Sequence, residues 1–117
     1  LVNKARAEAG LSPLKTDPTL TKAAMKRAEE QLELYGHTRP DGSGCFTVFR
    51  DYGLSYRAVG ENVAAGYATP EEVVNGWLNS SGHRANIMSS DYQYIGIGYA
   101  YTDSGYRHYW AQLFWKP

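Results

Sequence analysis

The chain has 117 residues, of which 43% are hydrophobic and 21% charged, and its twelve basic and twelve acidic side chains cancel. These values are typical of one globular domain with a hydrophobic core, and they exclude a disordered chain. The balanced charge argues against a nucleic-acid partner, and no apolar run approaches the roughly 18 residues that a membrane span needs.

The chain begins with Leu1 rather than Met and carries no signal peptide, so we interpret residues 1–117 as a single domain from a longer exported precursor. Cys45 is the only cysteine and cannot form an internal disulfide, so the fold must depend on packing. It lies in a Gly/Ser-rich turn with no histidine beside it in the sequence. We therefore predict an unreactive thiol.

Two helices are predicted in the first third of the chain. Val2 to Ala9 forms the first, which ends before Gly10. The second begins at Asp17-Pro18, where Asp caps free backbone N–H groups and Pro occupies the first turn. It is predicted to continue to about Tyr35 and to end at Gly36.

The face of the second helix follows from its four-residue spacing of apolar side chains. The residues that form this predicted apolar stripe are Leu20, Ala24, Ala28 and Leu32. The charged residues assigned to the solvent-exposed side are Lys22, Lys26, Arg27, Glu29, Glu30 and Glu33.

The middle of the chain is less regular. Residues 38–44 are predicted to form a loop, 47–60 give no clear pattern, and Glu61 to Ala65 is predicted as a short strand. A helix starts at residues 69–72, where Thr69 caps and Glu72 completes a capping box. A second short helix is predicted over His83 to Met88.

The chain ends in a predicted β-hairpin, with strands from Tyr94 to Tyr101 and from Tyr106 to Trp115. Gly96 and Gly98 lie opposite a face of large side chains, which suggests that another element packs closely against them. Helices first and strands last indicate an α+β domain of packed layers.

Two histidines and one carboxylate are the candidates for chemistry. His37 follows a helix, His83 begins one, and Glu61 stands in a segment bounded by glycines. Such a set can hold a zinc-type ion or perform acid–base catalysis. Their spacing matches no short metal-binding motif, so unrelated surface histidines remain the alternative.

Five segments, taken together and in order, resemble the motifs of the CAP superfamily, whose members include cysteine-rich secretory, antigen 5 and pathogenesis-related 1 proteins. They are GHTRPDG at 36–42, GENVAAG at 60–66, SGHRANIM at 81–88, IGIGY at 95–99 and YWAQLF at 109–114. The HRxNIM form resembles the bacterial branch, whose members are often exported or attached to the cell envelope.

The resemblance implies a three-layer α-β-α sandwich with a small, mostly antiparallel sheet. It also implies a central cleft lined by two His and two Glu, which binds a divalent metal in some members. His37, Glu61 and His83 match three of these positions. No residue matches the second Glu, and Glu72, the nearest carboxylate, is explained by its capping box.

The resemblance favours a secreted or envelope-associated binding module for an extracellular ligand, such as a protein, a lipid or a cell-wall component. Its cleft would include Asn62 and Gln112 and could hold a divalent metal such as zinc on His37, His83 and Glu61. One alternative is a metal-assisted hydrolase of peptidase type with Glu61 as the base, although no nucleophile–base set is visible. The other is a purely structural envelope module.

Overall fold

A three-stranded antiparallel sheet with strand order β1-β3-β2 lies at the centre of the computed structural model, which describes all 117 residues. The elements, in chain order, are α1 (Val2–Glu8), α2 (Pro18–Glu33), α3 (Thr47–Asp51), β1 (Ala58–Ala65), α4 (Pro70–Leu78), α5 (Ser81–Ile87), β2 (Tyr94–Tyr101) and β3 (His108–Lys116).

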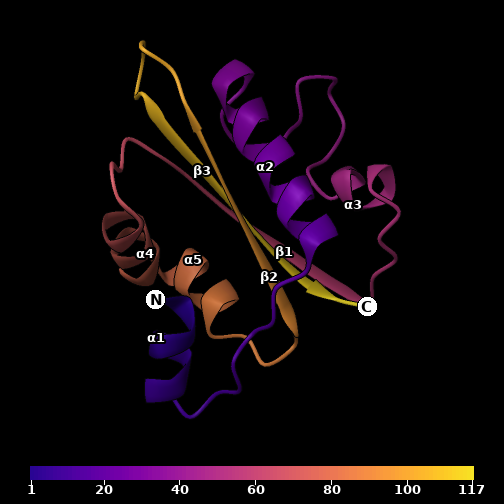
Figure 1. The fold of residues 1–117 in the computed structure, drawn as a ribbon, viewed down its shortest axis with the longest axis vertical. Coiled ribbons are helices and arrows are strands. Elements are labelled where there is room, and N and C mark those ends of the chain that lie inside the picture. The colour runs from indigo at the N-terminus through magenta and orange to yellow at the C-terminus, as the bar shows by residue number, and fades with distance from the viewer.

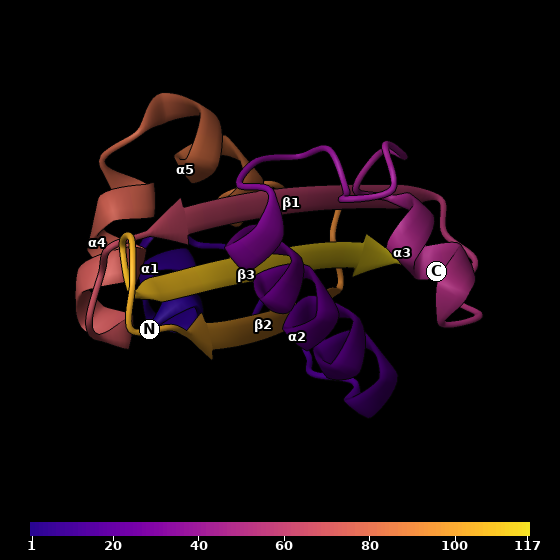
Figure 2. The ribbon, with the colours of Figure 1, turned by 90° about the horizontal axis from the view of Figure 1, so that it is seen from above.

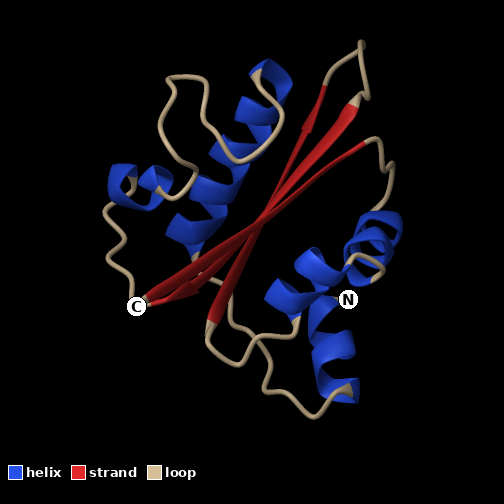
Figure 3. Ribbon diagram, turned by 180° about the vertical axis from the view of Figure 1, so that it is seen from behind, coloured by secondary structure: helices blue, strands red, loops and turns tan.

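Helices cover both faces of this sheet. The helices α2 and α3 lie on one side of the strands and α1, α4 and α5 on the other (Figures 1 and 3). Figure 2 shows β3 between β1 and β2, so β1 is an edge strand. The predicted α-β-α sandwich is therefore confirmed. No helix has both the length and the apolar character required to cross a membrane.

The helix α2 packs directly on the backbone of β2. Its N-terminus is capped as predicted, because the Asp17 carboxylate accepts the N–H of Leu20 at 3.0 Å. A Cβ atom added at Gly96 would lie 2.8 Å from the carbonyl oxygen of Leu20, and one at Gly98 would overlap the carbonyl of Ala24. The close packing expected at these glycines is confirmed.

The predicted solvent-exposed side of α2 was partly wrong. Arg27 and Glu30 are buried, at 0% and 6% exposure, whereas Leu32 is 40% exposed. A helix repeats every 3.6 residues, so Leu32 lies about 120° around the axis from Leu20 and leaves the core face. Arg27 and Glu30 can be buried on the core side of α2 because they form an ion pair with each other and Glu30 forms a second one with Arg39. The helix also ends at Glu33, two residues before the predicted end.

Other boundaries differ modestly from the prediction. The strand β1 begins at Ala58 rather than Glu61, and the unassigned stretch before it contains α3. The helix α5 begins two residues before His83, and β3 begins at His108 because the turn occupies the preceding residues.

The predicted cap of α4 is confirmed at Thr69, whereas Glu72 reaches back to Ala68, one residue before the N-cap residue that a capping box requires. Thr69 Oγ1 accepts the N–H of Glu72 at 3.2 Å, and the Glu72 carboxylate accepts the N–H of Ala68 at 3.2 Å. Glu72 therefore has a structural role at the start of this helix.

Two apolar layers hold the sandwich together. Trp77 and Ile87 pack with Phe114 on the face covered by α1, α4 and α5. Leu20 and Phe49 pack with Leu113 on the face covered by α2 and α3. Neighbouring residues of each strand thus point into different layers, which matters for the site described next.

Candidate functional site

Glu61 is the buried anchor of the site. It lies on β1 opposite Leu113 and is 5% exposed. Arg27 of α2 binds both carboxylate oxygens, with Nε 2.6 Å from Oε2 and Nη2 2.9 Å from Oε1. Two parallel charge-assisted hydrogen bonds fix the carboxylate and neutralise it.

The pair continues into a chain of charges of alternating sign. Arg27 also binds Glu30 at 2.9 Å, and Arg39 binds Glu30 at 2.8 Å and Asp51 at 2.6 Å. Burial alone would raise the pKa of Glu30, but the hydrogen bonds from Arg39 and Arg27 lower it overall. Glu30 therefore remains an anion held by the two arginines.

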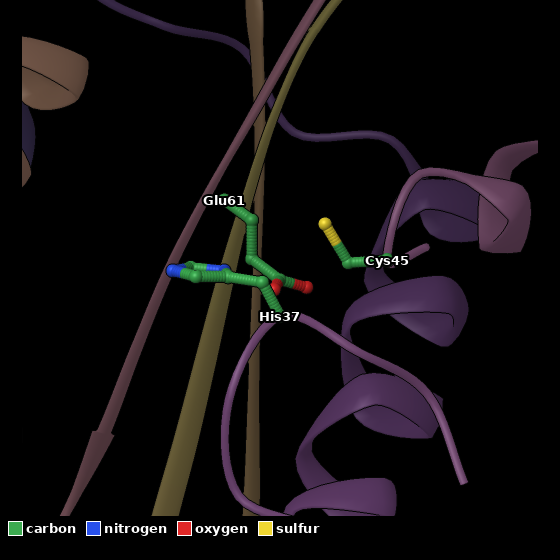
Figure 4. Close-up of side chains that lie close together, drawn as sticks. All are labelled: His37, Cys45 and Glu61. Carbon is green, nitrogen blue, oxygen red and sulfur yellow. The ribbon is translucent and has the colours of Figure 1, made fainter. Parts of the chain in front are cut away.

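His37 brings this network to the surface. Its Nδ1 lies 2.9 Å from Glu61 Oε1, while its side chain is 58% exposed. The loop before it is fixed at Gly36, whose carbonyl accepts Arg27 Nη2 at 2.8 Å and whose N–H donates to Gln31 at 2.8 Å. In Figure 4 the second ring nitrogen of His37 points away from Glu61. A carboxylate on Nδ1 selects the tautomer in which Nε2 keeps a free lone pair.

Cys45 is the neighbour that sequence reasoning missed. A bridge between Thr38 and Gly44 closes the loop, so the Cys45 N–H donates to the His37 carbonyl at 2.9 Å. One ligand atom each from His37, Cys45 and Glu61 lies within 4.8 Å of the others, and Figure 4 shows all three side chains converging. Burial and then the charge of Glu61 raise the pKa of Cys45 to about 12, which is consistent with the unreactive thiol that we predicted.

His83 lies outside this three-residue group. It belongs to α5, on the opposite face of β1, and its Nδ1 lies 3.0 Å from Ser80 Oγ. Burial and then the charge of His37 lower the pKa of His83. The imidazole is therefore favoured in its neutral form.

Asn62 and Gln112 are fully buried, and their side chains form hydrogen bonds beneath the segment that carries His83. Asn62 Nδ2 donates to the His83 carbonyl at 3.1 Å and to Gln112 Oε1 at 2.9 Å. Asn86 Nδ2 in turn donates to Asn62 Oδ1 at 2.9 Å. Neither Asn62 nor Gln112 presents a side chain at the surface, in contrast to the cleft positions expected for them.

The site is an exposed edge rather than a deep pocket. The five principal cavities are lined by other residues, and none includes His37, Glu61 or His83. The surface formed by His37 and His83 along β1, with Glu61 beneath it, is called the histidine edge below.

This fold and the five motif segments together define a CAP domain. The model of the CAP (cysteine-rich secretory protein) family matches residues 1–114, so the chain belongs to this family.

Relatives of known sequence or structure agree with this assignment. The chain is 39% identical over 116 residues to the uncharacterized protein YkwD of Bacillus subtilis, covering 97% of the chain and 44% of that protein. It is 30% identical to the uncharacterized membrane protein YlbC of the same organism, covering 99% of the chain and 32% of that protein. The chain thus spans less than half the length of either relative.

Two solved structures superpose closely. One is an extracellular protein with an SCP domain from Bacillus anthracis, with a TM-score of 0.87, 23% identity, and coverage of 99% of this chain and 38% of that one. The other is an outer surface protein from Borrelia burgdorferi, with a TM-score of 0.87, 28% identity, and coverage of 98% of this chain and 86% of that one. Both share the sandwich of helices around a small antiparallel sheet.

Proposed function

We propose that this domain is an extracellular or envelope-associated binding module whose histidine edge contacts the ligand and holds a divalent, zinc-type cation. The observation that carries the proposal is the way both histidines are held. Each Nδ1 is bound by a side-chain oxygen, of Glu61 for His37 and of Ser80 for His83, so each Nε2 is left available. Histidine ligands of metals are typically fixed in this way, with a carboxylate on the other ring nitrogen.

The donor chemistry fits a zinc-type ion. Neutral imidazole nitrogen is a preferred zinc ligand, and the lowered pKa of His83 keeps this ring neutral near pH 7. His37 and His83 would hold the ion, with Glu61 as the group that orients His37. A bound ion would supply a positive charge and open coordination positions for an oxygen or nitrogen of the ligand.

A second arrangement would place the cation on the inner face, between His37, Cys45 and Glu61. This set also has zinc-type donors. Two features weaken it. Both Glu61 oxygens already accept hydrogen bonds from Arg27, and the thiol must first lose a proton from a pKa of about 12.

The pairing of Glu61 with Arg27 also argues against the hydrolase alternative. A general base needs a free lone pair near the substrate, whereas this carboxylate is 5% exposed and is bound by Arg27 and His37. Binding without turnover is the function that this arrangement supports best.

The location and domain context are part of the same proposal. One similar structure is described as an extracellular protein and another as an outer surface protein, and the matching segment is only part of several longer relatives. We extend both properties to this chain: a single domain of a larger exported protein.

Zinc titration by calorimetry at pH 7.5 and pH 5.5 tests the proposal. Binding should weaken at pH 5.5, because protonated imidazole cannot coordinate, and should fall roughly tenfold or more in His37→Ala and in His83→Ala. His108→Ala is the matched control, since this histidine contacts Tyr99 at 2.6 Å and lies on β3. Loss in Cys45→Ser with no loss in His83→Ala would assign the inner arrangement. No zinc heat, or equal heat in the His37→Ala/His83→Ala double variant, would refute the metal site.

A further inference from the structure

A second candidate ligand site lies between the α1–α2 connector and the start of β2. A cavity of about 510 Å³ opens there and shares no residue with the histidine edge. Its wall includes Arg6 of α1, Ser12 and Lys15 of the connector, and Ser90 and Tyr94 near β2. A volume of this size suits a small organic molecule.

Arg6 is the unusual member of this wall. It is 2% exposed, yet its three hydrogen-bond acceptors are all main-chain carbonyls. Nε donates to Ser12 at 2.9 Å, and Nη1 donates to Ile87 at 2.8 Å and Ser89 at 2.7 Å. These dipoles satisfy N–H groups, but they leave the positive charge without an anion.

The other two buried arginines of the protein show the contrast. Arg27 binds Glu30 and Glu61, and Arg39 binds Glu30 and Asp51. Burial lowers the pKa of Arg6, whereas hydrogen bonds to carboxylates outweigh burial at the other two and raise their pKa values. A buried cation without a counter-ion destabilises the folded protein, and a bound anionic ligand would offset that cost.

One nitrogen of Arg6 is free to meet such an anion. Nη2 donates to no protein atom. Gln112 Nε2 is the only fully buried side-chain polar atom without a partner, so Arg6 Nη2 must retain contact with solvent. Arg6 lines this cavity and none of the other principal ones, so we take the cavity as the place where an anion would reach its free N–H groups.

The only other charged residue of the wall is also positive. Lys15 adds a second cation, and its backbone is fixed by hydrogen bonds to Gln93 at 2.9 Å and Ile95 at 2.8 Å. No Asp or Glu belongs to the wall. Asp91, which precedes the wall residue Tyr92, is exposed and lies outside it.

We infer that this cavity is an anion-binding pocket that takes the carboxylate or phosphate group of a small ligand. Arg6 Nη2 and Lys15 Nζ bind the oxygens, and the hydroxyl groups of Ser12 and Ser90 offer further donors. Guanidinium and ammonium groups are the usual partners of both oxyanions.

The test is a ¹⁵N NMR titration of the intact chain with sodium phosphate and with sodium acetate, each against sodium chloride at equal ionic strength. The inference predicts saturable shifts centred on the amides of Ser12, Lys15, Ser90 and Gln93. A preference for phosphate or for acetate identifies which oxyanion the pocket favours.

Lys15→Gln is the deciding variant, because Lys15 is exposed and its loss should not disturb the fold. It should weaken binding roughly two- to fivefold, the usual effect of one solvent-exposed ion pair. Lys22→Gln, a change of a lysine on α2 outside this cavity, is the matched control and should change nothing. Arg6→Gln should abolish binding, provided that thermal unfolding shows the variant to be folded.

Shifts that match those in chloride, that fail to saturate, or that are unchanged in Lys15→Gln would overturn the inference. None of these outcomes depends on the zinc experiment, since the two sites share no residue.

Discussion

Replacement of Arg27 by methionine should destabilise the domain by about 3–5 kcal/mol, because it leaves a buried carboxylate without its counter-ion. The substitution removes four hydrogen bonds: two to Glu61, one to Glu30 and one to the carbonyl of Gly36. Glu30 retains three hydrogen bonds from Arg39. The loss of stability therefore comes mainly from Glu61, whose side chain is 1% exposed and whose remaining charged partner would be His37.

Urea unfolding at pH 7, followed by the fluorescence of buried Trp77 and Trp110, measures this loss. The predicted cost is a large part of the roughly 5–15 kcal/mol that is typical of a domain. Lys26→Met, an exposed change on the same helix, is the matched control and should stay within about 0.5 kcal/mol of the parent.

A double-mutant cycle separates the ion pair from general damage to the helix. Arg27→Met/Glu61→Gln should be more stable than Arg27→Met alone, because no unpaired charge then remains in the core. The reasoning is refuted if Arg27→Met costs less than about 1 kcal/mol, or if adding Glu61→Gln lowers the stability further.

Three more changes test the packing and the titration of the site. Gly98→Ala should destabilise the domain by about 3 kcal/mol, because the new Cβ overlaps the Ala24 carbonyl and forces α2 off the sheet. Gly82→Ala, where the new Cβ meets open space, is the control; the two unfolding midpoints should differ clearly, and equal midpoints would contradict the packing. The pKa of His83 is lowered on folding, so its contribution to stability is complete above its ordinary pKa near 6.5 and is lost as the pH falls from there toward the folded-state pKa. His83→Gln should therefore flatten the acid side of the stability profile measured by urea unfolding, and an unchanged profile would count against this assignment. With a pKa of about 12, roughly one Cys45 thiol in ten thousand is ionised at pH 8. Iodoacetamide should therefore label Cys45 far more slowly in the native state than in urea, and equal labelling rates would be incompatible with its burial.

The parts of the fold that follow from local chemistry were accessible from the sequence. The Asp17-Pro18 and Thr69-Pro70 starts cap their helices as predicted, because a cap depends on a few neighbouring residues. Gly98 indicated a close approach, because a glycine inside a strand often marks a place where another backbone lies close to the sheet. The layer order itself came from the family resemblance rather than from these local signals.

The buried charges were not accessible in this way. Arg27 and Glu61 are 34 residues apart, and nothing in the local pattern of α2 shows that a carboxylate will face it. A charged residue is assigned to solvent by default, since burial is favourable only when a partner is supplied by distant chain. Cys45 was missed as a neighbour of His37 for a related reason: the closing loop, not the sequence spacing, brings them together.

The separation of the two histidines has a simple origin in β1. Glu61 and Asn62 are adjacent in the strand, so their side chains point to opposite faces of the sheet. Glu61 holds His37 from the layer of α2, and Asn62 holds the backbone of His83 from the layer of α5. Because β1 is an edge strand, loops from the two layers can approach each other around it without crossing the sheet. The position of one imidazole relative to the other therefore depends on both core layers at once. A change that shifts either helix should alter the zinc binding that we propose for the histidine edge, even where it touches neither ring.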